Sequence, residues 1–170
     1  EYYPNGQIKY EESVIDGKYS ILNAWDEDGK LLVRNGNGKW VTYYENGQIE
    51  NEESYRDGKK HGRWATYNEN GQIENEENYR DGKKHGKWAT YNEEGEIKEE
   101  VNFKDGAEHG KWSAYYENGK MKYEENYLDG IKHGKWISYR ENGQIYIVSN
   151  YKNGERDGSR TSYYGDGTIS

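Results

Sequence analysis

The sequence contains no cysteine and only one proline, one methionine and one phenylalanine among its 170 residues. Without cysteine it can form neither a disulfide framework nor a thiolate metal site, so the redox compartment stays open. No apolar run approaches the roughly 18 to 20 residues that a helix needs to cross a bilayer. Only 31% of the residues are hydrophobic and the mean hydropathy is -1.46, which excludes a thick hydrophobic core.

Aromatic residues supply what burial the chain can achieve, since they make up 15% of the sequence. Low hydrophobicity is also typical of disordered chains, but the aromatic content, a net charge of only -8 and strict patterning indicate order. Nucleic acids and anionic membrane surfaces attract basic faces. The acidic balance therefore predicts no nucleic-acid partner and disfavours a membrane.

A repeat of 24 residues organises the chain. Residues 63–86, RWATYNENGQIENEENYRDGKKHG, are nearly repeated by the next segment, KWATYNEEGEIKEEVNFKDGAEHG. A constant period of this length is typical of solenoid-like or extended-sheet architectures. The turn glycines that recur at this period, and to which we assign a structural role, are Gly47, Gly71, Gly95, Gly119, Gly143 and Gly167.

The predicted fold is all-β, an elongated, twisted single antiparallel sheet of stacked β-hairpin repeats. Residues 1–38 are expected to form irregular N-terminal hairpins that cap the array, because Gly29 follows Gly6 by 23 residues and Gly47 follows Gly29 by only 18. Terminal repeats are commonly atypical. Residues 39–170 are expected to form the regular array, continuous with the cap as one domain.

The residues around the recurring turn glycines indicate which type of loop joins the two strands of each hairpin. A two-residue type I′ turn needs positive φ at the residue before the glycine, where Glu94 stands in one repeat. A three-residue loop, a type I turn followed by glycine in a G1 bulge, needs positive φ only at the glycine and favours proline first, where Pro4 stands. We therefore predict the bulged loop.

This loop fixes a register across each hairpin. Tyr67 should face Ile73 and Ala65 should face Asn75, and Tyr79 joins the tyrosine face if no second bulge intervenes. One face then carries Tyr43, Tyr67, Tyr91, Tyr115, Tyr139 and Tyr163 with Ile49, Ile73, Ile97, Met121, Ile145 and Ile169. The opposite face, or the entry of each strand, carries Trp40, Trp64, Trp88, Trp112 and Trp136.

The four histidines, His61, His85, His109 and His133, occupy one column of the repeat. Such a column could hold metal ions or act as a pH switch. Stacked repeats would keep the rings about 10 Å apart, too far for one ion, and the same column carries Asn37 and Asp157. We assign the histidines to turns, since Asn, Asp and His are enriched in left-handed geometry, and expect no metal or cofactor.

Adjacent acidic residues recur in the second strand of the repeat, as in Glu52-Glu53 and Glu99-Glu100. Neighbouring residues on a strand point to opposite faces, so these carboxylates do not converge for acid–base catalysis or calcium binding. One interpretation is a solvated stripe that pairs with the cations Arg63, Lys87, Lys111 and Lys135. The other is a docking face for a basic protein, formed by Glu52, Glu76, Glu100 and Glu124.

The tryptophan column has two interpretations as well. Aromatic ladders stack on sugars, cations or extended peptides, and they also serve as packing spines. The sequence has no phosphate loop, nucleophile elbow or zinc motif. Catalysis needs unlike residues that converge at one place, whereas this array offers the same residues at every step, so we predict that the protein is not an enzyme.

The pattern Gly-Lys-Trp-x-x-Tyr-x-x-x-Gly-x-Ile, followed by Tyr-x-Asp-Gly-x-x-His-Gly, is found in residues 86–110 with Phe103 for the second tyrosine. It resembles the bacterial variant of the MORN repeat, closely over residues 39–167 and loosely over residues 2–38. The resemblance implies a meandering antiparallel sheet used as a binding or scaffolding surface, without shared catalytic residues. Some members look like antitoxin or immunity proteins. Many members have glycine where Glu53, Glu77 and Glu125 stand.

The leading hypothesis is a non-enzymatic scaffold module that presents a sheet face to another protein, in an antitoxin-like or immunity-like role. The alternative is an exported surface protein that binds glycan or a host surface through its aromatic stripe. The chain begins at Glu1 without an initiator methionine or signal peptide, which fits a processed N-terminus. Exported and cytoplasmic locations both stay open, as do the partner, the binding face and the oligomeric state.

Overall fold

The computed structural model describes residues 1–15 and 18–170, and of residues 15 and 18 the backbone alone. The described residues form 18 strands and no helix, and every strand pairing given for them is antiparallel. The fold is therefore an open all-β antiparallel sheet of hairpin repeats, as predicted.

Among these residues no helix could cross a membrane. The predicted division into residues 1–38 and 39–170 stays a prediction, as do the length and twist of the array.

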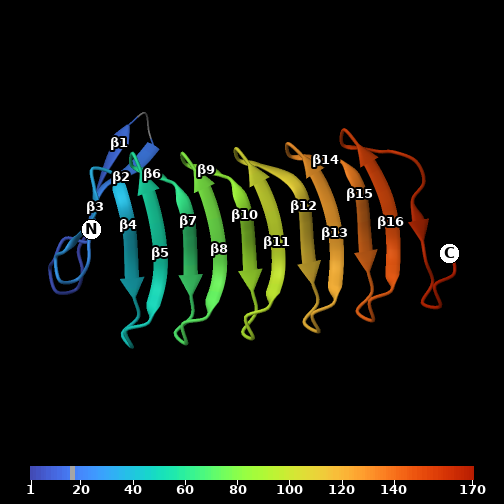
Figure 1. Cartoon of the computed structure of the whole chain (residues 1–170), viewed down its shortest axis with the longest axis horizontal. Coiled ribbons are helices and arrows are strands. Elements are labelled where there is room, and N and C mark those ends of the chain that lie inside the picture. Colours follow the sequence, from blue (N-terminus) through green and yellow to red (C-terminus); the bar gives the residue numbers. More distant parts are fainter. Residues whose placement is uncertain (16–17) are drawn as a thin grey trace. The chain divides into compact units, whose positions relative to one another are not determined.

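Two compact units make up the chain, residues 1–84 and residues 85–170. In the first, each long strand pairs with the long strand that follows it along the chain, and the two-residue strands pair with the long strand before them, so the hairpins lie side by side (Figure 1). Its strands are β1 (Tyr10–Ile15), β2 (Lys18–Trp25), β3 (Leu31–Arg34), β4 (Asn37–Tyr43), β5 (Ile49–Arg56), β6 (Lys59–Lys60), β7 (Gly62–Tyr67), β8 (Ile73–Arg80) and β9 (Lys83–Lys84).

The second unit repeats the same hairpin order. Its strands are β10 (Gly86–Tyr91), β11 (Ile97–Lys104), β12 (Ala107–Tyr115), β13 (Met121–Leu128), β14 (Ile131–Lys132), β15 (Gly134–Tyr139), β16 (Ile145–Lys152), β17 (Glu155–Arg156) and β18 (Thr161–Ser162). The two-residue strands β14 and β17 each follow a tight turn and pair back onto the strand before it. Successive hairpins are joined by the pairing of β13 with β15 and of β16 with β18.

The predicted bulged loop is confirmed at the Asn-Gly turn of residues 69–71. The Gly71 N–H donates to the Asn68 carbonyl at 2.8 Å, and the Asn68 N–H donates to the Gln72 carbonyl at 2.9 Å. Gly71 has a φ of 78°, which glycine adopts without steric cost. The same pair of hydrogen bonds closes the turns at Gly6, Gly29, Gly47, Gly95, Gly119, Gly143 and Gly167.

The register is partly different from the prediction. Tyr67 pairs with Ile73 as expected, but Ala65 pairs with Glu76 and not with Asn75. The reason is a register shift between Thr66 and Tyr67, which leaves one extra residue on β8 next to the loop. The shift also places Tyr79 on the face of Trp64, with the two ring centroids 5.7 Å apart.

The other turn of each repeat is a two-residue type I′ turn. Asp57 and Gly58 have φ angles of 50° and 71°, and Arg56 pairs with Lys59 across them. This turn suits the right-handed twist of the flanking strands, and Asp or Asn tolerates its positive φ at the first position. The equivalent residues with positive φ are Asn35, Asp81, Asp105, Asp129 and Asn153.

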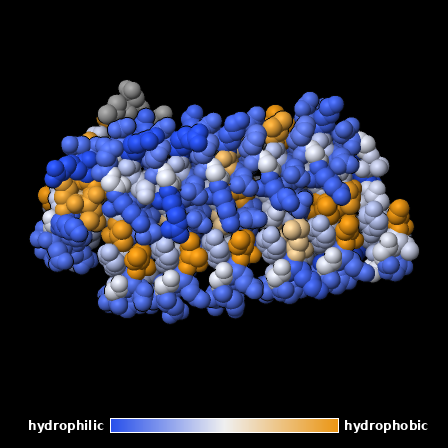
Figure 2. Space-filling model, in the orientation of Figure 1, coloured by the Kyte–Doolittle hydropathy of each residue, from blue (hydrophilic) through white to orange (hydrophobic). Residues whose placement is uncertain are grey.

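Two different faces result, because residues paired across strands point to the same side of a sheet. The tryptophan face carries the tryptophans with Tyr55, Glu53, Tyr79 and Glu77 in the first unit. The arginine face carries Arg63, Ala65, Tyr67, Glu52 and Glu76, and in the second unit the equivalent lysines and glutamates. On the face drawn in Figure 2, hydrophilic surface predominates and hydrophobic atoms form separate small patches.

The small core lies near the beginning of the first unit. Ala24 and Val33 are fully buried there against Trp40. Elsewhere the best-buried positions of the arginine face are small residues, and in the first unit Ala65 is 3% exposed. The fold therefore has a thin core, as the low hydrophobic content requires.

Candidate functional site

Ion pairs cover the arginine face. In the first unit, Glu52 accepts hydrogen bonds from Lys39 Nζ at 2.6 Å and from Arg63 Nη1 at 2.9 Å, and Arg63 Nε donates to Glu76 at 2.8 Å. In the second unit the pairs are Lys87 with Glu100 at 3.3 Å and Lys111 with Glu124 at 2.9 Å. The four candidate carboxylates of this face therefore already have cationic partners on neighbouring strands.

Glu52 lies at the centre of this ion-pair network. Its hydrogen bond with Lys39 is the main reason why its pKa is lowered. A lowered pKa contributes stability above the unfolded pKa of about 4.5, and that stability is lost as the pH falls through the folded value. We expect Glu52→Gln to lose about 1 kcal/mol at pH 7 and almost nothing at pH 3.

Urea unfolding at the two pH values measures this difference. Glu124→Gln is the matched control, because Glu124 pairs with a single lysine and should lose less. An equal loss at pH 7 and pH 3 would contradict an ionic contribution of Glu52.

The tryptophan face carries a ladder of alternating indole and phenol rings. In the first unit the Trp64 ring lies 5.1 Å from Tyr55 and 5.7 Å from Tyr79, both edge to face. In the second unit the ladder runs through Trp112, Tyr127, Trp136 and Tyr151 with centroids 5.0 to 5.7 Å apart. Neighbouring rings thus pack against each of these three tryptophans. Trp64, Trp88, Trp112 and Trp136 remain partly exposed.

Backbone and side-chain acceptors fix the indole orientation. Trp64 Nε1 donates to the Ser54 carbonyl at 2.8 Å, and Trp136 Nε1 donates to the Asn126 carbonyl at 3.0 Å. Trp112 Nε1 donates instead to the Glu99 carboxylate at 2.7 Å. These three indole N–H groups are thus used inside the sheet, which leaves the ring surface as the part of each of these tryptophans that a ligand could contact.

A carboxylate accompanies the tyrosine in several repeats. The Tyr55 hydroxyl donates to Glu53 at 2.6 Å, the Tyr79 hydroxyl to Glu77 at 2.8 Å, and the Tyr127 hydroxyl to Glu125 at 2.9 Å. Where Val101 replaces the glutamate, Phe103 replaces the tyrosine, so carboxylate and hydroxyl are lost together. The sequence analysis missed this pairing, which a comparison of positions two residues apart would have found.

Burial raises the pKa of Glu53, and its contact with Tyr55 only partly offsets this. A raised pKa contributes stability below the unfolded value, and this is lost as the pH rises through the folded value. The ionised carboxylate is therefore unfavourable at neutral pH. We expect Glu53→Gln, which keeps an oxygen acceptor for Tyr55, to raise the melting temperature by a few degrees at pH 7 and to change it little at pH 4.

Thermal unfolding followed by circular dichroism at both pH values checks this expectation. Glu53→Ala is the control, since it also removes the acceptor and should lower the melting temperature at either pH. A gain for Glu53→Gln that is the same at pH 4 and pH 7 would show that the charge is not the cause.

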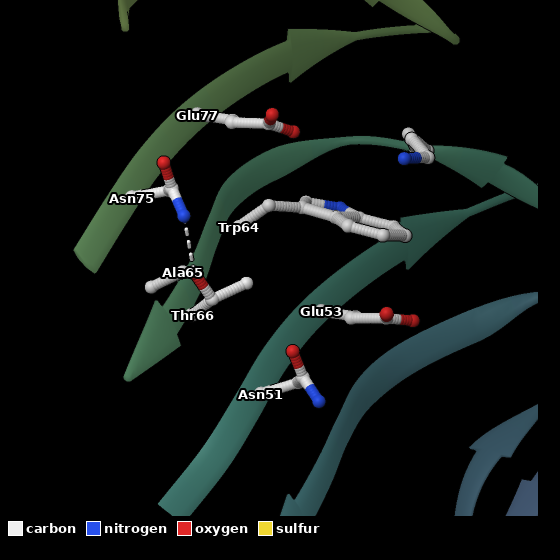
Figure 3. A pocket seen from close by; sticks show the side chains of 8 residues that line it. Asn51, Glu53, Trp64, Ala65, Thr66, Asn75 and Glu77 are labelled. Atoms are coloured by element: carbon white, nitrogen blue, oxygen red, sulfur yellow. Dashed lines mark hydrogen bonds between the residues drawn. The ribbon is translucent and has the colours of Figure 1, made fainter. Parts of the chain in front are cut away.

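A pocket of about 230 Å³ lies on the tryptophan face of the first unit (Figure 3). Trp64 lies in its middle, between Glu53 of β5 and Glu77 of β8. Its lining residues are Asn51, Glu53, Lys60, Trp64, Ala65, Thr66, Asn75 and Glu77. Trp64 is the single candidate from the sequence that lines it, whereas Asn51, Asn75 and Lys60 were missed.

Three of the four histidines, His61, His85 and His109, contact the turn of the following repeat, whereas His133 Nδ1 has no hydrogen-bond partner among the described residues. The Asp81 N–H lies 3.3 Å from His61 Nδ1, and the Asp105 N–H lies 3.4 Å from His85 Nδ1. Positive φ belongs to the aspartates and to Gly62 and its equivalents, so the expectation of left-handed geometry at the histidines is wrong. The side chain, and not the local backbone, explains the column, because Asn37 Oδ1 accepts from the Asp57 N–H in the same way.

Among residues 1–15 and 18–170, no group of three or more His, Asp and Glu side chains is placed to hold a metal ion. The carboxylates of the two faces point to opposite sides of the sheet.

The model of the MORN repeat variant matches residues 1–16, 36–57, 60–81, 84–105, 108–129 and 132–153. These segments make up more than half of the sequence. The chain belongs to the MORN repeat variant family. Five of the matched MORN segments end at the Asp or Asn that opens a type I′ turn, so the family unit coincides with the structural hairpin.

MORN repeats form a repeat-based interaction or scaffold module, generally without enzymatic activity, and the hairpin array described above is of this kind. A comparison with curated proteins gives no match.

Proposed function

We propose that this MORN repeat protein is a non-enzymatic interaction module that docks a basic segment of another protein on its tryptophan face. One observation carries the proposal. The carboxylates of the arginine face have cationic partners, whereas Glu53, Glu77 and Glu125 have no counterion within ion-pair distance in the described part of the chain.

The charge and chemistry of the tryptophan face are complementary to those of a basic peptide segment. Unpaired carboxylates beside partly exposed aromatic rings favour Lys and Arg side chains, which combine a charge with an apolar stem. The net charge of -8 adds long-range attraction for a basic partner. An antitoxin or immunity role, in which the basic partner is a toxin, is one form of this proposal.

A glycan-binding role on the cell surface is the second candidate. Two amides, Asn51 and Asn75, lie near the Trp64 indole, and an aromatic platform with polar neighbours is suited to a sugar ring. This candidate predicts retention of neutral oligosaccharides, which the first does not.

Immobilised protein challenged with basic, acidic and neutral peptides and with a glycan array separates the two candidates. The test variant combines Glu53→Gln, Glu77→Gln and Glu125→Gln. The matched control combines Glu52→Gln, Glu100→Gln and Glu124→Gln, which removes the same charge from the arginine face. We expect the test variant to lose at least about tenfold in affinity for basic peptides, and the control to keep its affinity.

Equal weakening by both variants would mean that binding follows net charge and not the tryptophan face. Retention of neutral glycans without basic peptides would establish the second candidate instead.

A further inference from the structure

We infer that the pocket around Trp64 is a binding site for one arginine side chain of a basic partner segment. The inference rests on the proposed function and adds the place and the chemical group. Its residues all belong to the first unit, on β5, β6, β7 and β8.

The pocket walls provide hydrogen-bond acceptors. Glu53 and Glu77 each use one carboxylate oxygen for a tyrosine hydroxyl, and within the described residues their other oxygens have no partner. Asn51 and Asn75 donate their amide N–H groups to Thr42 and Thr66, which leaves both amide oxygens to accept. Four acceptor oxygens around a flat ring match a guanidinium, which has five N–H donors and no acceptor.

Lys60 shows that the indole already accepts a cation. Its ammonium lies 3.8 Å from the Trp64 ring centroid and 4.8 Å from that of Tyr79. No described carboxylate lies within ion-pair distance of it. A flexible lysine that is held only by ring faces can move aside, and an arginine in its place would gain the carboxylates as well as the stacking.

The volume of the pocket and the residues beside the other tryptophans both favour a single arginine side chain at Trp64. A volume of about 230 Å³ is below the roughly 300 to 1,000 Å³ of ordinary ligand pockets, so one side chain fits better than an oligosaccharide. In the second unit Trp112 pairs with Val101 on one side, and Trp136 pairs with Ser149. Trp136 thus lacks a carboxylate on this side, and the Glu99 carboxylate beside Trp112 accepts from the indole N–H and from the Tyr123 hydroxyl. At Trp64 neither carboxylate bonds the indole, whose N–H donates to the Ser54 carbonyl, and this distinguishes the Trp64 pocket from both.

The test follows the indole N–H resonance of Trp64 by NMR on the full chain labelled with ¹⁵N, assigned with Trp64→Phe. The probes are N-acetyl-arginine amide and N-acetyl-citrulline amide, which has the same length and shape without the charge. We expect the arginine probe to shift Trp64 in a saturable way and the citrulline probe to bind at least about tenfold more weakly.

Three variants test which side chains determine the affinity for the arginine probe. Glu53→Gln combined with Glu77→Gln should weaken the arginine probe about tenfold or more, and Lys60→Met, which removes the internal cation, should strengthen it several-fold. Glu125→Gln is the control in the second unit and should change nothing. Unshifted resonances of the other tryptophans establish that each variant is folded.

Equal binding of both probes, or weaker binding by Lys60→Met, would overturn the inference. Retention of basic peptides by the tryptophan face with no response of Trp64 would overturn this site alone and leave the proposed function standing. A saturable arginine response at Trp64 without retention of any basic peptide would support the site and count against the proposed function.

Discussion

Gly36→Ala is expected to destabilise the first unit by more than about 4 kcal/mol, enough to prevent its folding at 37 °C. A β-carbon at this position would lie 2.2 Å from the backbone nitrogen of Gly58 and 2.7 Å from its α-carbon. The two turns are joined here backbone to backbone, because the Gly58 N–H donates to the Gly36 carbonyl at 3.0 Å. No side-chain rotation relieves such a clash, so the turns would have to separate.

Gly47→Ala is the matched control, since Gly47 also has positive φ and its β-carbon would meet nothing within 4 Å. It should cost only the roughly 1 to 2 kcal/mol of left-handed backbone strain. Urea unfolding followed by circular dichroism compares the two variants. Equal losses would show that contact between the turns does not contribute, and that strain alone decides the cost.

The bulged loops, and the placement of Trp64 and Tyr67 on opposite faces, could be predicted because they depend on local chemistry, whereas the face of Tyr79 was not predicted. Pro4 and the recurring glycines determine the bulged loop, and the loop determines the pairing of Tyr67 with Ile73. The pairing of Ala65 could not be obtained in the same way. An extra residue next to the loop has no marker in its residue type, and it shifts everything beyond it by one position.

The candidate site was predictable only in part. The tryptophan column and the opposite orientations of Glu52 and Glu53 were read from the repeat. The docking carboxylates were assigned to the column of Glu52, which has cationic partners, and not to that of Glu53, which has a tyrosine hydroxyl. The role of His61 and the place of Lys60 depend on how one hairpin lies on the next. Such contacts between repeats follow from the register and not from the local sequence.

The ladder of rings should carry much of the stability of the second unit. Trp136 lies between Tyr127 at 5.3 Å and Tyr151 at 5.0 Å, and its indole N–H is bonded to the Asn126 carbonyl. We expect Trp136→Ala to lose about 3 kcal/mol, because it removes two ring contacts, one hydrogen bond and most of the apolar burial at this step. Urea unfolding measures the loss.

Trp136→Phe is the control that separates these contributions, since it keeps an aromatic ring between the tyrosines and removes the indole N–H. It should lose about 1 kcal/mol, the value of one hydrogen bond. Repeat arrays are stabilised mainly through neighbouring units, so hydrogen exchange in Trp136→Ala should speed up first in β13, β15 and β16. A loss of protection spread evenly over β10 to β18 would instead show that the second unit unfolds as one cooperative block.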